Sequence, residues 1–328
     1  MKRAAGSHRQ RGVALIIALV LVSLATILAW KISFQGYLER RRSIGVLAVE
    51  QSIEFGMGAE ALAADVLLQS AQQSKQDTLA EAWAQPTQPL PITPEDDPEG
   101  EPIGTVQASL EDMQGRFNLN NLARVTQNGQ PDPAPLAQFQ RLLVSLNLEP
   151  KWAQIARDWI DADNNPGEPD GAEDSVYTSQ TPPYLTGNWP MTSPSELMAL
   201  PGFGLDRYLK IAPYVTALPI ANATINICTA SPLVLESLAD NLSGEYSGNP
   251  DAFLIGRKSG CFPDMNTFKA TLTPTVLAKI TGQFSDNTAY FRLTTHVTLG
   301  TAEFTLYSLL YRGNGGKVTP LLRSFGTL

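Results

Sequence analysis

The first strong pattern in the chain is an uninterrupted apolar run near its beginning. A short basic head ends at Arg11-Gly12, and 18 uncharged residues follow, from Val13 to Trp30. As a helix that rises about 1.5 Å per residue, this run would span about 27 Å, close to the hydrocarbon thickness of a bilayer. The pattern predicts a membrane-spanning helix over residues 13–30, with the basic head in the cytoplasm.

A cleaved secretion signal is the alternative interpretation of this segment. Such a signal combines a basic start, a shorter apolar stretch and a cleavage site made of small residues. Here the apolar run ends in WKISFQGYLERRR, which is bulky and charged and offers no A-x-A site. Lys31 and the arginines at 40–42 reduce the charge asymmetry across the run, but this exit still favours a helix that is retained.

Helical periodicity continues well beyond the apolar run. No proline occurs before Pro86, and apolar residues recur at helical spacing over residues 44–67. We therefore predict one helix over residues 13–85, whose second half is amphipathic and suited to packing against neighbours.

The next segment, residues 86–123, is expected to hold a loop and the first strands. Residues 72–104 are polar and then rich in proline, which is typical of a connection and not of a core element. TVQASLEDMQGRFNLN then alternates around its central Gln-Gly and predicts strand, turn and strand. A structural role in turns and caps is expected for three asparagines: Asn118, Asn120 and Asn121.

Residues 124–220 are predicted to be helical, because apolar residues recur there at spacings of three and four. LPGFG resembles the turn of a helix-hairpin-helix, a motif that holds nucleic-acid phosphates in other proteins. The net charge of −8 and the pI of about 4.9 argue against a nucleic-acid partner. Gly202 and Gly204 are therefore expected simply to make the turn. A further helix should follow, with Ser231 as its N-cap and Pro232 at its first position.

The pattern changes to the period of a strand within residues 221–328. YFRLTTHVTLG and AEFTLYSLLYR are rich in Thr, Val, Tyr and Phe and are separated by Gly300-Thr301, which predicts an antiparallel hairpin. RSFGTL predicts the end of a last strand. Combined with the long helix and the strands near 105–118, these elements predict an α+β fold. In this fold a sheet lies on the helix, and the helical block is an insertion.

An acidic loop is the segment with the most obvious chemical potential. Seven carboxylates lie within 17 residues: Asp158, Asp161, Asp163, Glu168, Asp170, Glu173 and Asp174. They repel one another unless a cation or solvent intervenes, and calcium prefers six to eight oxygen ligands. An EF-hand is excluded, because Pro166 stands where glycine is required and Ala172 where glutamate is required. A looser calcium loop and a solvated acidic loop remain as alternatives.

The composition offers little for catalysis. Of the two histidines, His8 lies in the basic head and His296 in a predicted strand, where a structural role is expected. Two cysteines are too few for a disulfide scaffold or a cysteine-rich zinc site. The sequence contains no zinc motif and no glycine motif that cradles phosphate. We therefore predict a structural protein and not an enzyme.

The beginning of the chain and four later segments resemble one protein family. RGVALIIALVL is similar to a prepilin leader, here residues 1–12, which prepilin peptidase cuts after a glycine, between Gly12 and Val13. The fifth position after the cut is glutamate in most such proteins but Ile17 here. The other matching segments follow in order: Leu110–Leu122, Arg157–Tyr177, Ser193–Phe203 and Thr224–Ala230. Together these segments resemble the minor pseudopilin K family of type II secretion systems.

The resemblance implies a pilin-like fold with an inserted helical domain. It also implies a single-pass inner-membrane protein with its bulk in the periplasm, and calcium in the inserted domain. The ligands it transfers are these: Asp161, Asp163, Glu173 and Asp174, then Asn188 and Ser193. The implied partners are minor pseudopilins I and J, through them H and the major pseudopilin G, and the prepilin peptidase. Because Cys228 and Cys261 would lie outside the cytoplasm, we expect a disulfide, with two buried thiols as the alternative.

Ile17 gives the resemblance a mechanism. In pilin-like fibres the glutamate at this position is thought to neutralise a neighbour's N-terminal ammonium, and an unpaired charge within the membrane costs several kcal/mol. A subunit with Ile17 cannot do this for a subunit above it, although its own Val13 ammonium can be neutralised from below. We therefore expect the chain to cap the pseudopilus and help start its assembly. The alternatives are a minor pilin of a type IV pilus or competence system and a signal-anchored periplasmic hydrolase.

Overall fold

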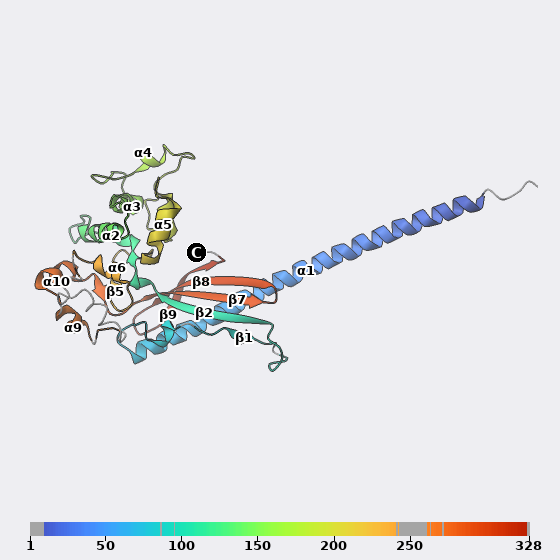
Figure 1. The fold of residues 1–328 in the computed structure, drawn as a ribbon, viewed down its shortest axis with the longest axis horizontal. Coiled ribbons are helices and arrows are strands. Elements are labelled where there is room, and N and C mark those ends of the chain that lie inside the picture. The colour runs from blue at the N-terminus through green and yellow to red at the C-terminus, as the bar shows by residue number, and fades with distance from the viewer. Residues whose placement is uncertain are drawn as a thin grey trace, which may run out of the picture.

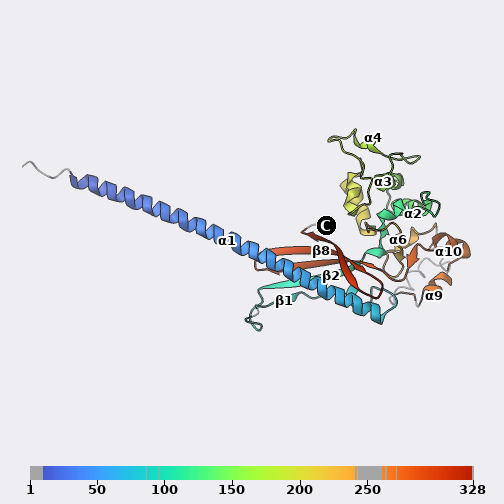
Figure 2. The ribbon, with the colours of Figure 1, turned by 180° about the vertical axis from the view of Figure 1, so that it is seen from behind.

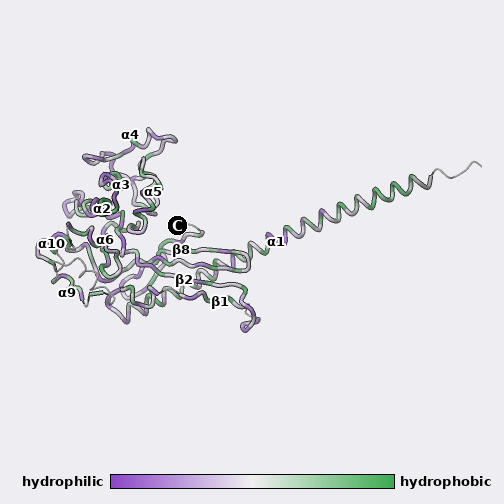
Figure 3. Tube along the Cα trace, viewed as in Figure 1, coloured by the Kyte–Doolittle hydropathy of each residue, from purple (hydrophilic) through white to green (hydrophobic). Residues whose placement is uncertain are grey.

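A single long helix dominates the structure. The computed structural model describes residues 10–326 apart from 86, 95, 241, 243–260, 263 and 271, so most of the predicted leader lies outside the described residues. Helix α1 (Gln10–Gln73) has 64 residues, and its first half projects alone from the folded part (Figure 1). This projecting half is the apolar part of the helix (Figure 3). Among the described helices it alone is long and apolar enough to cross a membrane.

The helix ends twelve residues earlier than predicted, at Gln73 instead of residue 85. The chain turns there because the side chain and backbone of Asp77 bind residues near the other end of the sequence. The Asp77 N–H donates to the carbonyl of Asp286 (3.0 Å), and its buried carboxylate accepts from the Thr288 N–H (2.8 Å) and pairs with Arg312. These long-range bonds outweigh the local tendency to continue the helix.

One antiparallel sheet packs against the second half of α1. Its strand order is β1-β2-β7-β8-β9, with these bounds: β1 Leu90–Ile92, β2 Gly104–Asp112, β7 Tyr290–Leu299, β8 Ala302–Arg312 and β9 Val318–Phe325. The view from behind shows α1 running across the sheet (Figure 2). The β7–β8 hairpin, in which Leu299 is paired with Ala302, and the last strand confirm the predicted C-terminal strands.

Two details of the first strands differ from the prediction. The proline-rich connection contains edge strand β1 and contributes the buried residues Trp83 and Ile92 to the core. After the turn at residues 113–115, β3 (Phe117–Asn118) does not pair with β2, as a simple strand–turn–strand would require. It pairs in parallel with β4 (Val215–Thr216), so the chain leaves the sheet at this point.

Glu60 fastens α1 to the C-terminal strands. Its carboxylate is buried and accepts hydrogen bonds from the Ser308 Oγ (2.6 Å) and from the Arg323 Nε (2.9 Å) and Nη2 (2.7 Å). Burial opposes ionisation, but these hydrogen bonds and the charge of Arg323 outweigh it and lower the pKa of Glu60. Around this ion pair Leu67 and Ala63 of the helix belong to the same buried cluster as residues of β7 and β8.

The helical part is inserted between neighbouring strands of the sheet. β2 and β7 pair directly, although residues 113–289 separate them in sequence. The inserted elements are α2 Pro133–Ser145, α3 Trp152–Ile160, α4 Asp174–Tyr177, η4 Pro194–Ala199, α5 Gly204–Ile211, β5 Ile225–Asn226, α6 Pro232–Glu236, α9 Met265–Ala270, α10 Pro274–Ile280 and β6 Phe284–Ser285. One hydrophobic core joins residues from Phe117 to Phe284. The insertion is therefore larger than the predicted block at 124–220, because the later helices share that core.

The predicted cap at Ser231 and the predicted glycine turn are confirmed. Asn118 caps η3 (Leu119–Ala123), whereas Asn120 and Asn121 lie inside that helix and bind backbone far away in sequence. The amide of Asn118 binds the backbone of Leu218 and Ile220, and the amide of Asn121 binds the backbone of Ala223 on both sides. Asn120, also buried, binds the backbone at Met191 and Leu218. Gly202 and Gly204 have φ of +83° and +74°, which glycine adopts readily. Ser231 caps α6 by accepting from the Val234 N–H.

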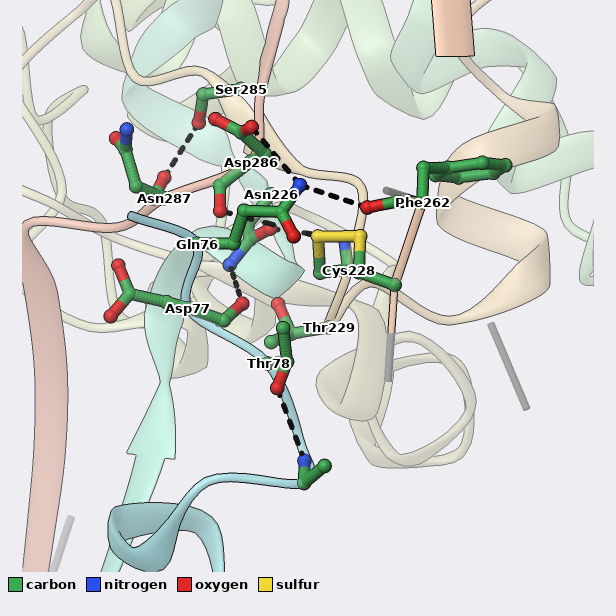
Figure 4. Close-up of a disulfide and its surroundings, with 12 residues drawn as sticks. Gln76, Asp77, Thr78, Asn226, Cys228, Thr229, Phe262, Ser285, Asp286 and Asn287 are labelled. Carbon is green, nitrogen blue, oxygen red and sulfur yellow. Dashed lines mark hydrogen bonds between the residues drawn. A yellow bond between two sulfur atoms is a disulfide. The ribbon is translucent and has the colours of Figure 1, made fainter. Parts of the chain in front are cut away.

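A disulfide between Cys228 and Cys261, the pair expected from the sequence, links two segments of the inserted part close to the end of α1 (Figure 4). The Cα atoms are 4.9 Å apart. Next to it, the side chain of Asn226 donates to the Asp77 carbonyl (3.0 Å), and Gln76 donates to the Phe262 carbonyl (3.0 Å). The bridge thus lies where three distant segments of the chain meet.

We expect Glu60→Gln to destabilise a soluble fragment that begins at Glu39 by about 1–3 kcal/mol, because it leaves Arg323 unpaired. Chemical denaturation measures this free energy of unfolding. Glu54→Gln, at an exposed position of the same helix, is the matched control. Since the pKa of Glu60 is lowered from its ordinary 4.5, its stabilisation should be lost as pH falls through the lower folded-state value. Equal stability of both variants would contradict the anchoring role.

The disulfide closes a loop between two cysteines that are 33 residues apart in sequence. Its reduction should lower the free energy of unfolding by about 3–4 kcal/mol, because the unfolded chain gains conformational entropy when the loop is released. The intact mass should rise by two hydrogen atoms on reduction, and the unreduced chain should take up no thiol reagent. The double variant Cys228→Ser, Cys261→Ser should reproduce the loss without reductant. Thiol labelling of the unreduced chain would contradict the pairing.

Candidate metal centre

The acidic loop is held closed by Asp158, which lies on the last turn of α3. This side chain is 1% exposed, and one carboxylate oxygen accepts from the N–H groups of Gly167 (3.0 Å) and Ala172 (2.9 Å). Its other oxygen accepts from the Gln154 Nε2 (2.7 Å). Asp158 therefore ties the middle and the last part of the loop to α3. Asp158 is not among the ligands that the family resemblance implies, although its position one turn before Asp161 places both on one helix face.

Three carboxylates converge at this point. Asp158, Asp161 and Glu173 each place an oxygen within 4.8 Å of the others. Glu173 is 3% exposed, and neither of its carboxylate oxygens has a hydrogen-bond donor. One buried oxygen of Asp161 and the amide oxygen of Asn188 also lack a donor. Buried oxygens without partners are costly and rare in folded proteins, so this arrangement suits a positively charged partner.

The charges of the cluster support the same conclusion. The pKa of Glu173 is raised to about 7, first by burial and then by the nearby charges of Asp161, Asp158 and Asp163. The pKa of Asp161 is raised to about 6, first by burial and then by Asp158 and Asp163. In the absence of a cation, the surroundings of Asp161 and Glu173 therefore disfavour ionisation of both carboxyl groups.

Asn188 is placed by an unusual backbone conformation. Its φ is +44°, a region that asparagine tolerates better than most residues. Its N–H donates to the Trp159 carbonyl (3.0 Å), and its side-chain amide donates to the Asn164 Oδ1 (2.8 Å). The amide nitrogen is therefore occupied, and the oxygen is left free to accept.

The other predicted ligands have partners within the chain. One oxygen of the exposed Asp163 accepts from the backbone and side-chain amide of Asn165. One oxygen of Asp174 accepts from the N–H and hydroxyl of Thr186, and these bonds lower the pKa of Asp174. The hydroxyl of Ser193 caps η4 in a capping box with Glu196. Among the predicted ligands, Asp161, Glu173 and Asn188 are therefore the ones with buried oxygens that lack a donor. Asp158, which was not predicted, joins Asp161 and Glu173 in the carboxylate cluster.

The chemistry of these donors fits a hard divalent cation. All of the free ligand atoms are oxygens from carboxylates and an amide, the type of ligand that calcium prefers. The group contains neither imidazole nor thiolate, so zinc is a poorer match.

His296, the described histidine outside the basic head, lies apart from this loop. It is exposed on β7 and has its Nδ1 3.0 Å from the Thr305 hydroxyl.

The other predicted assembly residues lie in the projecting part of α1. Gly12 and Val13 are both within the helix, which continues without a break through the predicted cleavage point. The side chains of Val13 and Ile17 are exposed, as are all others from Val13 to Leu47. An apolar helix that has no protein neighbour fits a lipid environment.

Comparison with known proteins identifies the family. A family profile described as "Type II secretion system (T2SS), protein K" matches residues 115–220. The type II secretion system protein K of Pseudomonas aeruginosa is 34% identical over 97% of this chain and 93% of its own length. That of Klebsiella pneumoniae is 36% identical over 69% of this chain and 68% of its own length.

A solved structure confirms the fold. A chain in the crystal structure of the GspK-GspI-GspJ complex from enterotoxigenic Escherichia coli superposes with a TM-score of 0.74 at 25% identity. The match covers 88% of this chain and 100% of that chain. The long helix, the antiparallel sheet and the inserted helices therefore form the expected pilin-like fold with a helical insertion. The chain belongs to the type II secretion system protein K family and is a minor pseudopilin.

Proposed function

We propose that this minor pseudopilin caps the tip of the pseudopilus and helps to start its assembly for protein export across the outer membrane. The observation that carries the proposal is Ile17 in the lipid-facing half of α1. From Val13 onward the first acidic residue is Glu39, about 39 Å along the helix at 1.5 Å per residue. The membrane segment therefore has no carboxylate to offer to the ammonium of another subunit, and neighbours can join from below alone.

The position of the inserted part supports the same end of the fibre. The described helices of the inserted part lie at the end of the sheet that is remote from the projecting half of α1 (Figure 1). A subunit stacked above this chain would have to occupy the space taken by this part. Tip placement is the position in which neither the missing carboxylate nor the added bulk obstructs a neighbour.

The partners and topology follow from the relatives. The E. coli relative was solved with GspI and GspJ, and we infer that this chain binds its own minor pseudopilins I and J. Through them it would meet H and the major pseudopilin G. Prepilin peptidase would cut between Gly12 and Val13 and leave a single inner-membrane pass, with the bulk in the periplasm. In this role the chain works as an assembly subunit without catalysis.

We further propose that the acidic loop binds calcium for a structural purpose. Asp161, Glu173 and Asn188 would supply the free oxygens, with Asp158 closing the loop and Asp163 beside it. Calcium would neutralise the crowded carboxylates and satisfy the buried acceptors. A loop with few apolar residues of its own would gain the fixed shape that a core cannot give it.

Replacing Ile17 by glutamate should leave membrane insertion intact but change the length of the pseudopilus or the position of this subunit in it. The new carboxylate would let a neighbour join from above. Ile16→Glu, one position away, is the matched control for the added charge. Site-specific cross-linking in cells measures the position. Cross-links of the unmodified chain distributed along the whole shaft would contradict the cap.

Calcium should raise the melting temperature of the periplasmic part, and a chelator should lower it. Glu173→Gln should weaken calcium binding by about tenfold or more, measured by titration calorimetry, because it removes the charge of a buried ligand. Glu168→Gln, at an exposed position of the same loop, should have little effect.

Protons compete with calcium for the same carboxylates. Because the pKa values are raised to about 6 for Asp161 and about 7 for Glu173, calcium affinity should increase with pH through this range. Identical melting in calcium and in chelator would refute the site, whatever the cross-linking result for Ile17.

A further inference from the structure

A collar of three arginines surrounds α1 just beyond its membrane-spanning segment. Arg40, Arg41 and Arg42 are consecutive and exposed, and Lys31 lies two to three turns before them. Glu39 is the single acidic residue between Val13 and Val49. The segment from Lys31 to Arg42 therefore carries a concentrated positive charge next to the lipid.

The three guanidinium groups point in different directions. Consecutive residues of an α-helix are about 100° apart around its axis, so Arg40, Arg41 and Arg42 span about 200° of the circumference. None of the ion pairs among the described residues involves these arginines. A partner helix alongside α1 would contact one or two of them. A headgroup layer through which the helix passes would surround all three.

An aromatic face marks the depth of the interface. Trp30 and Phe34 stack with ring centroids 5.4 Å apart, and the Arg41 guanidinium lies 5.5 Å from the centroid of Tyr37. Aromatic residues of this kind gather at the membrane–water boundary. Arg40 is about 40 Å along the helix from Val13, close to the full thickness of a bilayer with its headgroups. Long arginine side chains that lean back along the helix reach the phosphates from there.

The positive charge of the collar is unusual on the periplasmic side of a membrane helix and requires a negatively charged partner. Lysine and arginine are normally in excess on the cytoplasmic side of a membrane helix. In the topology proposed above, the collar lies on the opposite side, where it weakens the orientation signal. Anionic phospholipid headgroups are the negative groups that a helix meets on all sides at this depth, and each basic residue near such a surface contributes about 1 kcal/mol.

We propose that Arg40, Arg41 and Arg42 bind the phosphate groups of anionic phospholipids in the periplasmic leaflet and fix the depth of α1 in the membrane. The inference rests on the proposed membrane insertion of α1. The collar limits how far α1 can move, because shifting the arginines into the hydrocarbon core would remove water and headgroups from three charges. Moving it outward would separate those charges from the phosphates.

The test uses the full chain labelled with a fluorophore at Gly36→Cys. A Cβ atom added at position 36 would have nothing within 4 Å, and both natural cysteines are in the disulfide. The labelled chain is reconstituted in phosphatidylcholine vesicles that contain either brominated phosphatidylglycerol or brominated phosphatidylcholine. We expect quenching to favour phosphatidylglycerol by about tenfold at low ionic strength and less at high salt.

Two triple variants decide the role of the arginines. Arg40→Gln, Arg41→Gln, Arg42→Gln should lose the preference and retain quenching by brominated phosphatidylcholine, because the apolar segment still inserts. Arg40→Lys, Arg41→Lys, Arg42→Lys should keep the preference, since it depends on charge. Inorganic phosphate should reduce it no more than chloride does at equal ionic strength.

Other results overturn the proposal. Equal quenching by both lipids in the natural chain would do so. A preference that survives in the glutamine variant would also do so, because it would show that other residues recognise the anionic lipid. A specific effect of inorganic phosphate would reassign them to the free ion. Failure of both lipids to quench any variant would instead refute the membrane insertion on which the inference rests.

Discussion

The ladder between β2 and β7 is the constraint on which the rest of the structure depends. It runs in continuous register from Gly104↔Leu299 to Asp112↔Phe291. This ladder places β1 on one side and the β7–β8–β9 hairpins on the other, and so creates the surface on which α1 packs. The same two strands are the point at which the inserted part leaves the sheet and returns. If this pairing were lost, neither the helix nor the insertion would have a defined support.

A buried polar network reinforces the exit from the ladder. The Asp112 carboxylate, at the end of β2, accepts from Asn226 (2.8 Å), from the Thr229 hydroxyl (2.6 Å) and from the Gln114 N–H (2.7 Å). Burial raises the pKa of Asp112 despite these bonds. Asn226 also binds the backbone of Asp77 beyond α1. Satisfied networks of this kind specify one arrangement, because any alternative would leave buried groups unpaired.

Local periodicity predicted the elements whose contacts are close in sequence, and failed where distant partners decide. The hairpin at Gly300 follows from alternation and a turn residue, and the amphipathic half of α1 from its spacing. The end of α1 at Gln73 depends on Asp286, Thr288 and Arg312, more than 200 residues away, and no local signal contains them. The candidate metal centre shows the same division. Its acidic residues are visible in the sequence, but the buried oxygens of Glu173 and the clasp made by Asp158 are properties of the folded loop.

The register pair Asp112↔Phe291 has a consequence for the history of the fold. Because the two ends of the inserted segment are neighbours across the ladder, a tight turn of a few residues would bridge them without changing the order of any strand. A pilin without the insertion could thus gain or lose this helical part as one unit and keep its sheet and its long helix. The insertion determines the size of the subunit, whereas the sheet and the long helix determine whether it can join the fibre.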